Sequence, residues 1–246
     1  MINEKMAADL RALGIKSDDT ILMHSSMKSL GYVEGGPDTV IDTLISVLSE
    51  GTLLIPALSF RTCRPETPVF SVKDSPSCVG LISETFRKRE GVIRSVHPSH
   101  SVCGIGKYAE EILSQHIKST TPAGPDSPFA LLPKYNGKVL LLGCGLQPNT
   151  SMHAIEELTR PDYLMRDGSF PFKLILEDGS TVEKNYEFHN FANTGQRYQR
   201  LVDHMHIDTG KVLEADCHLI DAKTMWKVVY EAMQKDPLCF VEKIVK

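Results

Sequence analysis

Short apolar runs alternate with segments of helical periodicity along the first 160 residues of the chain. The pattern predicts buried strands at 20–23, 52–55 and 139–142, with a helix over 37–50 between the first two. A further helix near 150–158 follows the third strand. Strands that are apolar throughout and connected by helices are typical of parallel sheets covered on both faces.

The rest of the chain carries weaker or different patterns. We expect helices over 3–13, over 78–89 with Ser77 as N-cap, over 107–117, and from Asp221 to about Lys235, with short strands at 92–93, 101–103, 211–214 and 217–220. Proline-containing loops are expected at 60–76 and 119–128. After residue 165, 170–176 and 181–188 form a predicted β-hairpin around Asp178-Gly179. The predicted fold is a three-layer α/β/α sandwich around a largely parallel sheet, one domain over 1–246, with an antiparallel β elaboration in the C-terminal third.

Composition and charge narrow the choice of partners. The chain has 246 residues, 41% of them hydrophobic, and 27 Lys+Arg against 31 Asp+Glu, a formal net charge of −4. No segment has the dense basic stripe that nucleic-acid binding needs, and no run approaches the ~20 apolar residues of a membrane span. The first five residues lack the pattern of a signal peptide. We therefore expect a cytoplasmic protein that binds neither nucleic acid nor membrane.

Several familiar signatures are present only in part. The six cysteines are scattered without a C-x-x-C pair, so they are expected to be free thiols. Gly104-x-Gly106-x-x-Ala109 matches a loose dinucleotide fingerprint, but the preceding predicted strand is very short. His204-x-His206 could hold a metal ion but has no obvious third ligand nearby. The sequence predicts neither a nucleotide fold nor a metal site.

Four polar segments, 24–31, 94–101, 126–129 and 149–156, stand out, and an α/β protein builds its sites where strands end. In the last of these, His153 and Glu156 are three residues apart on the predicted helix and share a face. A carboxylate there can hold an imidazole in one tautomer and stabilise its charged form, as the acid of a Ser-His-Asp triad does. The simpler interpretation is an ordinary ion pair on a helix surface.

Taken together, ordered motifs of this chain resemble the aminoglycoside 3-N-acetyltransferase family over most of residues 20–160. The motifs are His24-x-Ser26 with Leu30-Gly31 and Gly35-Gly36, Gly51-Thr52 leading to Pro56, Arg94-Ser95-x-His97-Pro98, Ser127-Pro128, Gly143, and Thr150-x-x-His153-x-x-Glu156. The resemblance implies an N-acetyltransferase that uses acetyl-CoA as cosubstrate and no metal. The implied acceptor is a small-molecule amine, foremost the 3-amino group of a 2-deoxystreptamine aminoglycoside antibiotic.

The resemblance also implies roles for individual residues. His153 would be the general base and Glu156 its partner. The segments matching 25–33 and 97–102 would lie along the pantetheine arm, and Ser127-Pro128-Phe129 would help line that side. The predicted coenzyme site therefore consists of Ser25, Ser26, Leu30, Gly31, Val33, His97, Ser101, Val102, Ser127 and Phe129. The backbone N–H groups of Ser25, Ser26 and 101–102 are candidates to stabilise the thioester oxygen. At His100 the chain differs from the common family pattern, and 195–198 has no assigned role.

Two alternatives remain open from the sequence. Cys144, between Gly143 and Gly145 at the end of a predicted strand, could be the nucleophile of a cysteine-dependent acyltransferase or amidohydrolase. The chain could also be a CoA-binding relative that acts on a different amine or does not turn over. A monomer and a homodimer are both compatible with the sequence.

Overall fold

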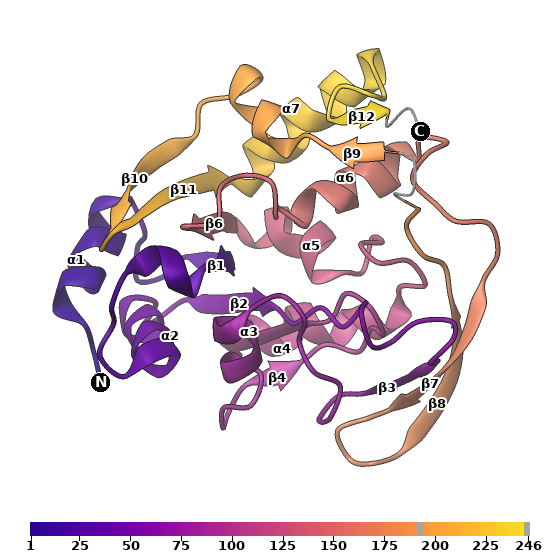
Figure 1. Ribbon diagram of the computed structural model, residues 1–246, viewed down its shortest axis with the longest axis horizontal. Helices are drawn as coiled ribbons and strands as arrows, with labels where there is room; N and C mark the ends of the chain where they lie inside the picture. The colour runs from indigo at the N-terminus through magenta and orange to yellow at the C-terminus, as the bar shows by residue number, and fades with distance from the viewer. Residues whose placement is uncertain (191–193, 244–246) are drawn as a thin grey trace.

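The computed structural model describes residues 1–190 and 194–243 (Figure 1). The α-helices are α1 (Glu4–Ala12), α2 (Gly36–Val47), α3 (Leu81–Phe86), α4 (Ala109–Leu113), α5 (Pro128–Leu131), α6 (Ser151–Thr159) and α7 (Ala222–Lys235). The 3-10 helices are η1 (Met27–Leu30), η2 (Ser114–Lys118), η3 (Leu132–Tyr135) and η4 (Tyr198–Asp203). The strands are β1 (Thr20–Ser25), β2 (Thr52–Pro56), β3 (Val69–Ser71), β4 (Ile93–Arg94), β5 (Val102–Gly106), β6 (Lys138–Leu142), β7 (Phe170–Ile175), β8 (Thr181–Tyr186), β9 (Thr194–Gln196), β10 (Asp208–Val212), β11 (Ala215–Asp221) and β12 (Val241–Lys243).

The main sheet has seven strands in the order β10-β11-β6-β1-β2-β5-β4. The central strands β6, β1 and β2 are parallel, whereas β11 and β5 join them antiparallel on either side. Following the pairings outward, β10, β6, β1, β2 and β4 point one way and β11 and β5 the other. The predicted, largely parallel sheet is therefore confirmed, with antiparallel pairing at both of its edges.

Helices cover both faces of this sheet. In β1, Ile21 and Met23 point toward a core formed with α1, α2 and α3, whereas Leu22 points to the other face. That second face packs against α4, α5, α6 and α7. Successive side chains of a strand point to opposite faces, so a strand buried on both needs a continuous apolar run. This confirms the three predicted layers.

The antiparallel elaboration consists of two hairpins. The predicted one is β7 with β8, and β3 extends it into a separate three-stranded sheet with its own core, drawn at the lower right of Figure 1. The other, β10 with β11, adds to the edge of the main sheet. β3 lies within the segment that the sequence predicted as a loop, and the short pair β9–β12 was not predicted.

Some helices differ from their predicted lengths. The helix expected at 78–89 is α3, and its N-cap is Gly80 rather than Ser77, whose hydroxyl instead bonds the hydroxyl of Ser83 at 2.8 Å. The segment 107–117 divides into α4 and η2. Within residues 1–190 and 194–243, no helix combines the length and the apolar character needed to cross a membrane.

Candidate active site

The candidate site lies where the central strands end and α6 begins. The Nδ1 atom of His153 lies 2.7 Å from Oε2 of Glu156, one turn further along the helix. The His153 side chain is 13% exposed and the Glu156 side chain is fully buried. The contact expected from their spacing is therefore confirmed, and it is a buried pair rather than an ion pair on the surface.

Two tyrosines complete the surroundings of Glu156. The Tyr198 hydroxyl donates to Oε2 of Glu156 at 2.8 Å and also lies 2.9 Å from Nδ1 of His153. The Tyr163 hydroxyl donates to Oε1 at 3.0 Å. Burial alone raises the pKa of Glu156, but the hydrogen bonds from His153 and Tyr198 outweigh it, and the pKa lies below its ordinary value. Glu156 is thus a buried carboxylate that stays ionised.

His153 faces a pocket of about 340 Å³. Its lining includes Leu58, Phe60, Ser99, His100, Gln147, Pro148, Asn149, Thr150, His153, Phe188, His189, Gln196 and Tyr198. The rings of His153 and His189 have centroids 4.8 Å apart, and His100 lies 5.6 Å from His189 by the same measure. Burial lowers the pKa of both His100 and His189 well below the usual value, so these two imidazoles are neutral at pH 7.

A second pocket, of about 270 Å³, adjoins the first and shares Leu58, Pro148 and Thr150 with it. His24, Ser25 and Cys144 line this pocket only. Nε2 of His24 accepts a hydrogen bond from the Thr150 N–H at 3.4 Å. The two pockets therefore form neighbouring compartments at the ends of β1 and β6, with the His153 ring in one of them.

Most of the other predicted coenzyme residues have side chains inside the protein. Leu30 and Val33 belong to the core on the α1–α3 side of the sheet, and Val102 and Phe129 to the core on the opposite side. Ser127 caps α5 by accepting from the Ala130 N–H. Of the predicted coenzyme residues, Ser25 lines the smaller pocket. A coenzyme role for the rest stays a prediction, and these side chains also form the scaffold.

The buried polar members of this set have partners of their own. The Ser101 hydroxyl donates to the Ala57 carbonyl at 2.8 Å. His97 is fully buried, accepts the His100 N–H on Nδ1 at 3.1 Å and stacks on His116. His97 thus anchors the 97–100 turn from inside.

Hydrogen bonds within the protein already occupy two of the backbone N–H groups proposed as donors for the thioester oxygen. The Ser26 N–H bonds the Leu142 carbonyl at 2.9 Å, and the Val102 N–H bonds the Ser95 hydroxyl at 2.8 Å. Gly31 has φ +75°, and a Cβ there would lie 2.3 Å from the Glu214 carboxyl carbon. The positive φ therefore favours glycine at position 31, and the nearest atoms belong to the flexible Glu214 side chain between β10 and β11.

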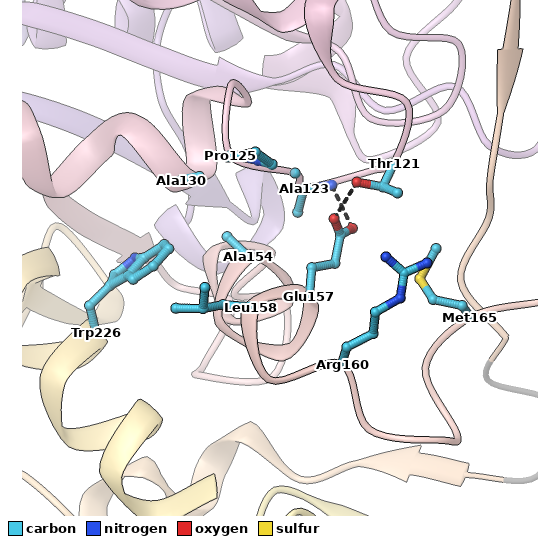
Figure 2. Close-up of a pocket in the computed structure, with 11 residues that line it drawn as sticks. Thr121, Ala123, Pro125, Ala130, Ala154, Glu157, Leu158, Arg160, Met165 and Trp226 are labelled. Carbon is cyan, nitrogen blue, oxygen red and sulfur yellow. Dashed lines mark hydrogen bonds between the residues drawn. The ribbon is translucent and has the colours of Figure 1, made fainter. Parts of the chain in front are cut away.

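A larger cavity, of about 430 Å³, lies on another face of α6 (Figure 2). Its walls are mostly apolar, and its charged residues are Glu157 and Arg160. Glu157 points toward Thr121 and Ala123, from which it accepts hydrogen bonds at 2.5 and 2.7 Å. It also bonds Nε2 of His189 at 2.7 Å. Because Glu157 and Arg160 both have hydrogen-bond partners of their own, the pocket of about 340 Å³ with His153 is the better candidate for chemistry.

Comparison with known proteins identifies the family. A model of the family described as aminoglycoside 3-N-acetyltransferase matches residues 22–234. This chain belongs to the aminoglycoside 3-N-acetyltransferase family. The family consists of acyltransferases, and the match extends past residue 165, where the sequence resemblance was faint.

Relatives from several bacteria support the assignment. The chain is 36% identical over 204 residues to aminoglycoside N(3)-acetyltransferase VII of Streptomyces paromomycinus, covering 74% of this chain and 68% of the relative. It is 31% identical over 242 residues to the aminoglycoside N(3')-acetyltransferase-like protein YokD of Bacillus subtilis, covering 88% and 86%. The crystal structure of YokD superposes with a TM-score of 0.81 over 95% of this chain and 93% of YokD. Apo AAC(3)-IVa, 28% identical, gives 0.80 over 96% and 90%.

Proposed function

We propose that this chain is an acetyl-CoA-dependent N-acetyltransferase. The acceptor we propose is the 3-amino group of a 2-deoxystreptamine aminoglycoside, with direct transfer of the acetyl group. Family membership and the names of the relatives support this. The structure of AAC-IIIb with CoASH supports it as well. That protein is 25% identical to this chain, with a TM-score of 0.79 over 96% of this chain and 97% of AAC-IIIb. A mutant of AAC(3)-IVa, 28% identical, was solved in complex with gentamicin. The observation that carries the proposal is the buried His153–Glu156 pair facing a pocket.

His153 acts as the general base in this proposal. Its Nδ1–H donates to Glu156, and the tautomer with hydrogen on Nδ1 has its lone pair on Nε2. Nε2 takes a proton from the amine as the nitrogen attacks the carbonyl carbon of the thioester, so that the C–N bond forms and the C–S bond breaks. His153 then returns that proton to the departing sulfur. Glu156 stabilises the imidazolium between these two transfers.

We propose that the two adjoining pockets divide the substrates between them. The compartment with His24 and Ser25 would take the acyl carrier, in line with the expected role of Ser25. The compartment with His153, His189 and Gln196 would take the acceptor amine. Acetyl-CoA supplies the activated acetyl group, and the chain supplies the base at the boundary. We also propose that residues 1–246 act as one domain.

Replacing His153 tests the proposal directly. His153→Ala is expected to lower kcat by roughly 10²- to 10⁴-fold, because general-base catalysis contributes that much. The variant should still bind acetyl-CoA, seen as a rise in Tm when ligand binds the folded state. Thiol release with a panel of aminoglycosides and simple amines measures turnover.

His206→Ala is the matched control, since the His206 side chain is 89% exposed and lines neither compartment. Unchanged turnover in His153→Ala would remove His153 from the mechanism. Coenzyme binding without thiol release for any acceptor would make the chain a CoA-binding relative.

A further inference from the structure

The Glu156 carboxylate receives more hydrogen bonds than a simple histidine–glutamate pair requires. Oε2 lies 2.7 Å from Nδ1 of His153 and accepts the Tyr198 hydroxyl at 2.8 Å. Oε1 accepts the Tyr163 hydroxyl at 3.0 Å. Two phenols from different parts of the chain therefore converge on one buried carboxylate, one at each oxygen.

The two tyrosines reach Glu156 by different routes. Tyr163 lies in the segment after α6, seven residues beyond Glu156. Tyr198 begins η4, directly after β9, and is 42 residues away in sequence. Tyr198 also lines the compartment that contains His153, whereas Tyr163 lines neither this compartment nor the one with His24 and Ser25. Tyr163 can therefore affect the reaction only through Glu156.

Both phenols remain protonated donors over the range in which an enzyme works. Burial, together with the charge of Glu156, raises the pKa of Tyr198 and of Tyr163 well above the ordinary value of a phenol. A protonated phenol can donate to a carboxylate and thereby spread its negative charge. These bonds compensate Glu156 for the water it has lost by burial.

We propose that Tyr198 and Tyr163 are positioning residues for the His153 base. They hold Glu156 ionised and in place, and so keep the imidazole in the tautomer with hydrogen on Nδ1. Tyr198 also lies 2.9 Å from Nδ1, so it constrains the ring as well as the carboxylate. This inference rests on the proposed function of His153 as general base.

The other titratable groups around His153 do not obscure the influence of the two tyrosines on its imidazole. His24, His100 and His189 approach it from β1, the 97–100 turn and the segment after β8, and burial lowers the pKa of each. They are therefore neutral near pH 7. Glu157 is held by Thr121, Ala123 and His189. Since the acceptor amine is the same in every assay, a difference between wild type and variant in the acidic limb of kcat/KM accordingly reports the His153–Glu156 pair.

Removal of one phenol should move that limb to higher pH. Without a donor, the negative charge of Glu156 is less spread and holds the imidazolium more tightly, so the pKa of His153 rises. Since only the neutral imidazole accepts a proton, the enzyme then needs a higher pH to work. Tyr198→Phe should also lower kcat roughly 10- to 100-fold, because the carboxylate and the ring are then held less firmly in the reactive geometry. Tyr163→Phe should have the smaller effect, in the same direction.

The experiment measures kcat, KM and kcat/KM against pH for wild type, Tyr198→Phe, Tyr163→Phe and a control, Tyr230→Phe. Tyr230 is an exposed residue of α7. We expect both site variants to shift the limb upward with the KM for acetyl-CoA nearly unchanged, and the control to match wild type. Lower kcat at every pH with an unmoved limb would mean a merely structural role and overturn the proposal. A change confined to the acceptor KM in Tyr198→Phe would make Tyr198 a substrate contact instead.

A second readout separates this proposal from the proposed function. The imidazole nitrogens of His153, followed by NMR of protein with ¹⁵N-labelled histidine and no substrate, report its tautomer and pKa without turnover. An upward pKa shift in Tyr163→Phe supports the positioning role even if one variant loses stability. If the tyrosine variants shift the pKa of His153 but the wild-type protein transfers no acetyl group, only the proposed function is defeated. Identical titrations in all the proteins would defeat only the role of the tyrosines.

Discussion

At the scale of single residues, the state of ionisation separates the competing mechanisms. Glu156 is buried yet has a lowered pKa, because His153 and Tyr198 donate to it. Cys144 is different: burial raises the pKa of its thiol to about 12. A cysteine nucleophile needs the opposite shift, because the thiolate is the reactive species. The surroundings of Cys144 therefore favour direct transfer over an acyl-enzyme.

Cys144→Ala should accordingly keep its kcat at saturating acetyl-CoA. The sulfur lines the smaller compartment, so any effect of its loss should appear in the KM for acetyl-CoA. Thiol release measures both constants, and intact-protein mass spectrometry after incubation with acetyl-CoA should find no acetylated Cys144. Loss of turnover in this variant, or an acetyl thioester on Cys144, would establish the cysteine mechanism instead.

The sequence predicted only the local part of the site. His153 and Glu156 are one helical turn apart, so their contact follows from helix geometry alone. Tyr198 and His189 reach the same pocket from segments outside α6. Their positions depend on the pairing of β9 with β12 and on the path of the chain after β8, which no local pattern encodes. An aromatic residue in the otherwise unassigned segment 195–198 was the one available signal.

At the scale of elements, the ends of β6, η1 and β11 meet tightly beside the site. Gly143, directly after β6, has φ +71°, and a Cβ there would lie 2.7 Å from Cβ of Ser29 and 2.9 Å from Cβ of Ala215.

The sequence predicted β1, β2 and β6 well, because an apolar strand buried on both faces has a clear pattern. It missed β3 and β9, which have three residues each and depend on distant partners.

Gly143→Ala should destabilise the protein, because the new methyl group meets two side chains and the backbone is in the left-handed region. We expect a loss of at least about 2 kcal/mol in the free energy of unfolding. Thermal denaturation should show this as a fall in Tm of roughly 4 °C or more. Gly145→Ala is the matched control, with φ +65° and no atom within 4 Å of the added Cβ, and it should lose only about 1 kcal/mol. Equal losses in the two variants would contradict the steric argument.

At the scale of the whole molecule, histidines fill the junction between the main sheet and the small β3-β7-β8 sheet. His97 stacks on His116 at 4.8 Å and meets the edge of Tyr186, which belongs to β8, at 4.9 Å. Burial lowers the pKa of His24 and of His116 to about 3, and also lowers those of His97, His100 and His189. The fold therefore holds these imidazoles in the neutral form.

This arrangement predicts an acid-sensitive fold. Below about pH 6.5 the unfolded chain protonates these histidines while the folded chain does not, so stability falls as the pH falls toward the folded-state values. Each histidine contributes up to about 1.4 kcal/mol per pH unit. Against a native stability of roughly 5–15 kcal/mol, five such groups should unfold the chain before the pH reaches about 4.

Denaturant unfolding between pH 7.5 and pH 5 measures the slope of stability against pH. His116→Gln should reduce that slope by up to one proton, because it removes one buried imidazole, whatever it does to stability at pH 7.5. His206→Ala should leave the slope unchanged, because that imidazole is exposed in the folded chain as well as in the unfolded chain. A stability that does not vary between pH 7 and pH 5 would contradict the buried, neutral state of the whole cluster. The same measurement bears on function, since His100 and His189 line the compartment of His153, and a charge on either would repel the imidazolium that His153 forms in the proposed reaction.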